Sequence, residues 1–201
     1  MPFIRPLPDD EVTGAVAEAY GADLAEDGYV SNVSRTFSHR PQVLAAWIGL
    51  KDAVTSSMDR RRYELATLAA ARRVRSSYCM LGHGEVLASK FYDSQQLRNI
   101  ALDHHAAGLE EVDVAIMDLA DKVAADATSV TQGDVDRLRE LGLSDAEVFD
   151  VVAAAAIRCF FTKLVDGLGF QPDAAYGELD ERLREALVVG RPIEQLRSEP
   201  S

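Results

Sequence analysis

Apolar residues recur along this chain every three or four positions, the spacing that places them on one face of an α-helix. Val12, Val16, Ala19 and Tyr20 form one such stripe after an acidic opening, and residues 112–123 repeat it. No segment shows the sustained alternation, rich in Val, Ile, Thr and aromatic residues, that is typical of a half-buried strand. The pattern therefore predicts an all-α protein.

One segment is apolar nearly all round rather than on one face. Between Val148 and Cys159 almost every residue is apolar, which is typical of a helix in the middle of a bundle. Ser144 and Glu147 precede it in the S-x-x-E pattern of a capping box. We expect this helix to lie at the centre of the fold.

Turn and capping signals divide the rest of the chain. Gly108 and Gly142 stand where helices should end, Pro41 suits a first helical turn, and Asp59 and Thr131 are candidate N-caps. We predict eight or nine helices in a helical bundle, near 9–26, 41–57, 60–75, 77–91, 94–107, 111–126, 132–141, 145–168 and 173–189, with an irregular segment at 28–39 and a polar tail from about 190.

Length and charge narrow the function. A chain of 201 residues fits one domain with a single core. Its net charge of −12 argues against nucleic-acid binding, because phosphate contacts need clustered Lys and Arg. The basic residues do cluster at 60–62 and 72–75, but within one predicted helix and near its end, where we read them as a solvated or subunit-facing surface.

The same composition suggests a location. No apolar run reaches the roughly 18 residues that a membrane helix needs, and the opening MPFIRPLPDDEV lacks the features of a signal peptide. Two cysteines, Cys79 and Cys159, make no disulfide framework. A reducing cytoplasm is the expected compartment.

The stretch SSYCMLGHG holds the first candidate chemistry. Ser76 or Ser77 could cap a helix, which would put Cys79 in its first turn, where free N–H groups and the helix dipole favour the thiolate. His83 lies four residues later on the same face. A lone cysteine is also often a small buried apolar residue, so both interpretations stay open.

The preceding predicted helix adds a carboxylate. Glu64 stands among small and apolar residues and shares a face with Leu68 and Ala71, so we expect it to point into the core. A buried carboxylate with a raised pKa suits proton transfer. The alternative is a surface ion pair with Arg60 or Arg61.

A metal site is also conceivable but incomplete. Cys79 and His83 would form half of one. His104 and His105 are adjacent in a predicted helix and should point apart, so they supply no obvious second half. We therefore expect neither a metal nor a cofactor.

The segment ELATLAAARRVRSSYCMLGHGEVL, residues 64–87, resembles the core motif of the alkylhydroperoxidase D-like family, also called the carboxymuconolactone decarboxylase superfamily. That motif is a Glu, then Cys-x-x-Cys, then a His four residues after the second Cys. Glu64, Cys79 and His83 match it, and Ser76 stands at the first cysteine. The likeness to the family's longer peroxidase-related branch extends over most of residues 1–195, and implies one domain over 1–201 with its core motif in 60–91.

This resemblance implies a thiol peroxidase that forms homo-oligomers, from dimers to hexamers. Cys79 matches the cysteine that attacks the hydroperoxide and becomes a sulfenic acid, and Glu64 and His83 match the residues that relay the proton. Ser76 and Tyr78 would line the site, with Tyr78 either a donor to the peroxide or a packing residue. Since Ser76 cannot form the family's disulfide, an external thiol would reduce the sulfenic acid, or Cys159 would resolve it if it lies within disulfide reach.

Two other functions stay open. A decarboxylase-like enzyme would use His83 and Glu64 without redox chemistry, and would need a cation such as Arg75 or Arg158 for a carboxylated substrate. A catalytically silent helical oligomer would hold the three motif residues as a buried polar cluster. In that last case Cys79 should react slowly and titrate near or above the free value of about 8.5.

Overall fold

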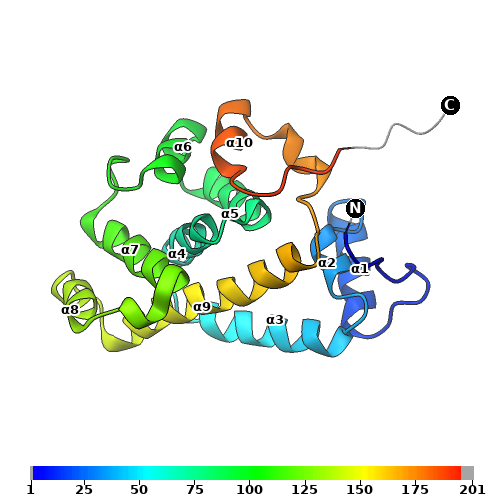
Figure 1. Cartoon of the computed structure of the whole chain (residues 1–201), viewed down its shortest axis with the longest axis horizontal. Coiled ribbons are helices and arrows are strands. Elements are labelled where there is room, and N and C mark those ends of the chain that lie inside the picture. Colours follow the sequence, from blue (N-terminus) through cyan, green and yellow to red (C-terminus); the bar gives the residue numbers. More distant parts are fainter. Residues whose placement is uncertain (1, 196–201) are drawn as a thin grey trace.

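The computed structural model describes residues 2–195, and over this range the chain is all-α, with no strand (Figure 1). The α-helices are α1 (Ala15–Glu26), α2 (Asn32–Thr36), α3 (Pro41–Thr55), α4 (Arg60–Arg73), α5 (Ser77–Lys90), α6 (Ser94–Leu102), α7 (Glu111–Asp126), α8 (Gln132–Glu140), α9 (Asp145–Gly167) and α10 (Glu181–Leu187). Two 3-10 helices, η1 (Ala127–Ser129) and η2 (Ala174–Glu178), complete the secondary structure of this range.

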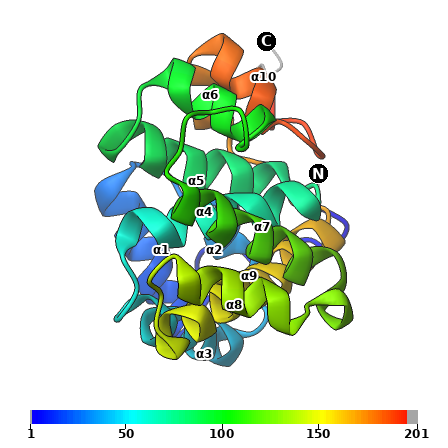
Figure 2. The ribbon, with the colours of Figure 1, turned by 90° about the vertical axis from the view of Figure 1, so that its left-hand side faces the viewer.

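The centre of the bundle is α4 rather than α9. Residues 63–71 of α4 are all buried, and α4 packs against α5, α7 and α9 (Figures 1 and 2). Five of those nine residues are alanine or threonine, whose small side chains let neighbouring helices approach closely. The long helix α9, which we expected at the centre of the fold, contacts α2, α3, α4, α7 and α8 but leaves Phe149 and Phe160 exposed.

The capping signals predicted most helix boundaries. Ser144 and Glu147 form the expected capping box, and the Asp59 carboxylate accepts the backbone N–H of Arg62. Gly108 and Gly142 end their turns with φ values of 72° and 96°, a region that glycine adopts without steric cost. These local devices explain why the predicted boundaries at α4, α7 and α9 lie close to the observed ones.

Three predicted boundaries are wrong. The first helix begins at Ala15 rather than near residue 9, because Gly14 takes a positive φ that is incompatible with a helix. The irregular segment contains α2, which Ser31 caps by accepting the N–H of Ser34. The predicted helix 94–107 ends at Leu102.

The last predicted helix, 173–189, is two elements. Leu179 and Asp180 interrupt it with extended backbone, and the Asp180 carboxylate then caps α10 by accepting the Leu183 N–H. Residues 196–201 of the predicted polar tail lie outside the described residues. Within residues 2–195, no helix has both the length and the apolar character that crossing a membrane would require.

Candidate functional site

A pocket of about 470 Å³ opens between α3, α4, α5 and α9. Its lining includes the three motif residues Glu64, Cys79 and His83, and also Tyr78 and Arg158. The aromatic residues of its wall are Trp47, Tyr63, Tyr78, Phe161 and Tyr176. The fold therefore brings residues of α4, α5 and α9 to one cavity.

The turn between α4 and α5 sets the position of the cysteine. Arg75 takes a φ of 59°, rare for a residue other than glycine, and reverses the chain so that α5 begins at Ser77. The hydroxyl of Ser77 accepts the backbone N–H of Gly190 at 2.7 Å, which fastens the turn to the C-terminal segment. Cys79 consequently lies in the first turn of α5, as the sequence predicts.

The two serines do not cap the helix as we expected. Ser76 occupies the N-cap position, but its side chain makes no capping hydrogen bond. Its hydroxyl is fully buried and acts on two acidic groups instead: burial raises the pKa of Cys79 and of Asp166, and hydrogen bonding from Ser76 opposes that rise in both. Ser76 therefore adds a small favourable effect on the thiolate to that of Arg158.

The thiol of Cys79 is 3% exposed and its sulfur lies 3.5 Å from Nη1 of Arg158. Burial raises the pKa of this thiol, and the charge and hydrogen bond of Arg158 act in the opposite direction. The sequence suggested that a helix start would lower the pKa, but desolvation is the larger effect here. At neutral pH the resting residue is therefore mainly the thiol.

Arg158 is a buried cation without an anionic partner. It is 4% exposed, and its second terminal nitrogen donates to the Tyr63 hydroxyl at 3.3 Å. No carboxylate within the described chain lies in ion-pair range of it; its guanidinium instead rests 5.2 Å from the ring centre of Phe161. A buried unpaired charge is costly, so Arg158 strongly favours any negative charge that forms beside it.

Glu64 and His83 form a pair in the same pocket. Nδ1 of His83 hydrogen-bonds Oε2 of the fully buried Glu64, and Nε of Arg60 lies 2.7 Å from Oε1 of Glu64. The carboxylate is buried, as we expected, and its pairing with Arg60 is not the surface ion pair of the alternative, because Glu64 itself is hidden from solvent. Arg61 instead pairs with Asp113.

The protonation state of His83 follows from its surroundings. Burial and the charge of Arg158 lower the pKa of His83 to about 4, against the opposing effect of Glu64. The ring is therefore neutral at pH 7, with its proton on Nδ1, where Glu64 accepts it. Nε2 remains as the proton acceptor of the ring.

Tyr78 lines the pocket, as we expected, but its hydroxyl is already engaged by other groups of the protein. Its hydroxyl donates to the carboxylate of Asp173 and accepts the backbone N–H of Val33 at 3.0 Å. Desolvation and the neighbouring Asp173 raise the pKa of Tyr78 well above its usual value. Its single proton is already donated, so Tyr78 ties α5 to the segments before η2 and at α2.

Neither a protein-family model nor a curated protein matches this chain. Solved structures do. The alkylhydroperoxidase AhpD core of an uncharacterized peroxidase-related protein from Ralstonia eutropha has a TM-score of 0.79 at 21% identity, over 87% of this chain and 94% of that one. An uncharacterized peroxidase-related protein from Silicibacter sp. has a TM-score of 0.74 at 18% identity, over 88% of this chain and 92% of that one.

The chain has the alkylhydroperoxidase D-like fold. The same fold is found in the debrominase Bmp8, with a TM-score of 0.71 and 12% identity over 92% of this chain and 97% of that one. A cysteine-to-alanine variant of that debrominase has been solved in complex with 2,3,4-tribromopyrrole. Identities this low show the fold alone.

Within this alkylhydroperoxidase D-like bundle, Arg158 is the residue whose position sequence reasoning missed. We considered it only as a cation for a carboxylated substrate, whereas it contacts the thiol directly. The signal was available, because Arg158 is the one charged residue between Val151 and Phe161. The other candidate cation, Arg75, lies outside the pocket and donates to the Val189 carbonyl at 3.2 Å.

Cys159 does not line the pocket that holds Cys79. It is half-buried, and both cysteines are free thiols in the described structure. Burial raises the pKa of Cys159, opposed by Lys163 and Arg158. A resolving role for Cys159 remains a prediction.

Proposed function

We propose that this protein is a thiol-dependent oxidoreductase that reduces organic hydroperoxides through Cys79. The observation that carries the proposal is the 3.5 Å approach of the Arg158 guanidinium to the Cys79 sulfur, inside a pocket that also holds the Glu64–His83 pair. A thiol needs deprotonation and stabilisation of its anion before it attacks a peroxide. Arg158 supplies the stabilising charge and His83 the proton acceptor.

The reaction begins with transfer of the Cys79 proton to Nε2 of His83. Glu64 stabilises the resulting imidazolium through Nδ1–H, and Arg158 stabilises the thiolate. The sulfur attacks the terminal oxygen of the hydroperoxide, the S–O bond forms and the O–O bond breaks. The departing alkoxide takes the proton from His83 and leaves as the alcohol, so that Cys79 holds a sulfenic acid.

Two external thiols complete the cycle. The first condenses with the sulfenic acid of Cys79, releasing water and leaving a mixed disulfide. The second attacks that disulfide, which restores the Cys79 thiol and releases the oxidised reductant. Ser76 cannot take the place of the first external thiol, because its hydroxyl forms no disulfide.

A second candidate is thiol-dependent removal of a halogen from a small aromatic ring. Its support is the aromatic wall of the pocket, from Trp47, Tyr63 and Phe161, together with the shared fold of a debrominase. The ring would gain a proton and lose bromide, with the two electrons supplied by Cys79 and an external thiol. Bromide release from 2,3,4-tribromopyrrole in the presence of a thiol tests it.

Intact mass after one equivalent of an organic hydroperoxide, with dimedone present, tests the leading proposal. We expect one dimedone adduct in the wild type and in Cys159→Ser, and none in Cys79→Ser. A loss of two mass units that needs both cysteines would instead make Cys159 the resolving partner. Wild-type protein that stays unmodified would overturn the peroxidase proposal and favour the decarboxylase-like or silent alternatives.

A further inference from the structure

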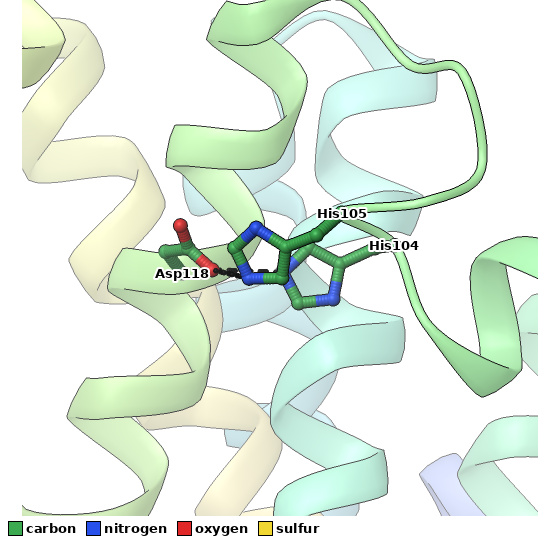
Figure 3. Close-up of side chains that lie close together, drawn as sticks. All are labelled: His104, His105 and Asp118. Carbon is green, nitrogen blue, oxygen red and sulfur yellow. Dashed lines mark hydrogen bonds and ion pairs between the residues drawn. The ribbon is translucent and has the colours of Figure 1, made fainter.

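A second cluster of polar side chains lies away from the thiol pocket, where the turn after α6 meets α7 (Figure 3). It consists of His104, His105 and Asp118. We propose that these three residues bind one divalent metal ion of the zinc class, with water completing its coordination. Two imidazole nitrogens and one carboxylate oxygen are a donor set that suits Zn²⁺ and its first-row neighbours.

The end of α6 brings the two histidines together. Helix α6 stops at Leu102, and Asp103 takes extended backbone. The Asp103 carboxylate then accepts the backbone N–H of His105 at 3.0 Å, which fixes the turn. Because the two histidines lie in this turn and not in a helix, our expectation that they point apart is wrong.

Both rings place Nε2 close to the same carboxylate oxygen, and the His104 contact is a hydrogen bond. Nε2 of His104 lies 2.8 Å and Nε2 of His105 lies 3.0 Å from Oδ1 of Asp118 (Figure 3). The ring centres are 4.3 Å apart, with 33° between the ring planes. Ligand atoms around a tetrahedral zinc ion are separated by about 3.3 Å. The two nitrogen–oxygen distances are close to this value, and the three ligand atoms all lie within 4.8 Å of one another.

Within the described chain, Asp118 has no Lys or Arg beside it, unlike three of the other four acids of α7. Three other acids of that helix pair with arginine: Glu111 with Arg137, Asp113 with Arg61, and Asp121 with Arg73. No Lys or Arg of residues 2–195 lies within ion-pair distance of Asp118, which faces two imidazoles instead. A divalent cation would provide the positive charge that Glu111, Asp113 and Asp121 obtain from arginine.

The exposure of the three side chains suits an ion that enters from solvent. His104 is largely buried, with 11% of its side chain exposed, while His105 and Asp118 are 59% and 47% exposed. Neither Nδ1 makes a hydrogen bond within the described structure, so each ring can hold a proton on Nδ1 while Nε2 binds the metal. The partly exposed site leaves room for coordinated water.

Titration of the tag-free, chelator-treated chain with ZnCl₂ by calorimetry tests the proposal. We expect one Zn²⁺ per chain, with affinity at least tenfold weaker in His105→Ala and in Asp118→Asn. His39→Ala is the matched control, because His39 is another exposed histidine and lies far from His104 and His105 in the sequence. This variant should bind zinc as the wild type does. Cys79→Ser should also bind normally, which separates this site from the thiol pocket.

The spectrum of Co²⁺ bound to the wild-type protein gives a second readout, which does not require any variant to fold. We expect d–d bands without a thiolate-to-cobalt charge-transfer band, because all three donors are nitrogen or oxygen. Zinc binding that survives both His105→Ala and Asp118→Asn would overturn the proposal. So would the absence of saturable one-to-one binding in the wild type, or a charge-transfer band that disappears in Cys79→Ser.

Discussion

Nη1 of Arg158 lies 3.5 Å from the sulfur of Cys79, although the two residues are 79 positions apart. The guanidinium belongs to helix α9, and the thiol lies in the first turn of α5. The contact places an unpaired positive charge beside a thiol whose burial disfavours ionisation. The balance between these two effects decides how reactive Cys79 is.

Replacing Arg158 with Met should raise the pKa of Cys79 further, because the charge that favours the thiolate is removed while the thiol stays buried. We expect alkylation of Cys79 by iodoacetamide near neutral pH to slow by roughly tenfold, the effect of about one pKa unit. In the wild type the labelling rate should keep rising with pH beyond about 8.5. Labelling rates from intact mass across a pH series measure both effects.

The matched control is Arg98→Met, an arginine of α6 that does not line the pocket. It should leave the labelling profile unchanged. Equal rates in Arg158→Met and the wild type at every pH would show that the guanidinium is not coupled to the thiol.

The free energy of unfolding should fall as the pH is lowered, because His83 becomes protonated. Its folded pKa of about 4 lies below its ordinary value of about 6.5, so the unfolded chain binds the proton more readily between these pH values. The contribution of His83 is therefore fully present above pH 6.5 and is lost as pH falls toward 4. We expect a loss of roughly 1–3 kcal/mol in the free energy of unfolding from this group.

Urea denaturation at pH 7 and pH 4.5 measures this loss, with His83→Gln beside the wild type. The glutamine variant keeps a side-chain donor for Glu64 but cannot titrate, so its stability should change less over the same interval. Equal pH dependence in the two proteins would contradict the depressed pKa.

Asp113 should be far more important to stability than Asp121, although both belong to α7 and both pair with arginine. Asp113 is fully buried and pairs with Arg61 at 2.5 Å, whereas Asp121 and its partner Arg73 are 27% and 50% exposed. Removing one partner of a buried pair leaves an uncompensated charge and costs about 3–5 kcal/mol. We expect Asp113→Asn to lose at least 2 kcal/mol more of unfolding free energy than Asp121→Asn, measured by chemical denaturation.

Gly190→Ala should destabilise the turn that positions Cys79. A Cβ at Gly190 would collide with the backbone carbonyl of Arg75, and the Gly190 N–H donates to Ser77. We expect a loss of about 1–3 kcal/mol, typical of overpacking, in thermal or urea unfolding. Gly49→Ala in α3 is the control, because its Cβ would meet open space and should stabilise that helix by up to about 1 kcal/mol.

The sequence by itself determined the helical class and most helix boundaries. Apolar spacing and caps such as the Ser144–Glu147 box act between residues close along the chain, so they can be read without knowing the fold. The spacing of Glu64, Cys79 and His83 likewise identified the three motif residues that the pocket brings together. The predicted boundaries were wrong where the backbone conformation of a single residue ends or prevents the helix, as at Gly14 and after Leu102.

Only the tertiary structure decided the electrostatics of the two sites. The contact of Arg158 with Cys79, the donation of the Tyr78 proton to Asp173, and the meeting of both histidines at Asp118 all join residues from different elements. Burial then determined the pKa of Cys79, against the helix-start effect that local reasoning favoured. Desolvation depends on everything packed around a group, and helix packing brings those neighbours from distant parts of the chain.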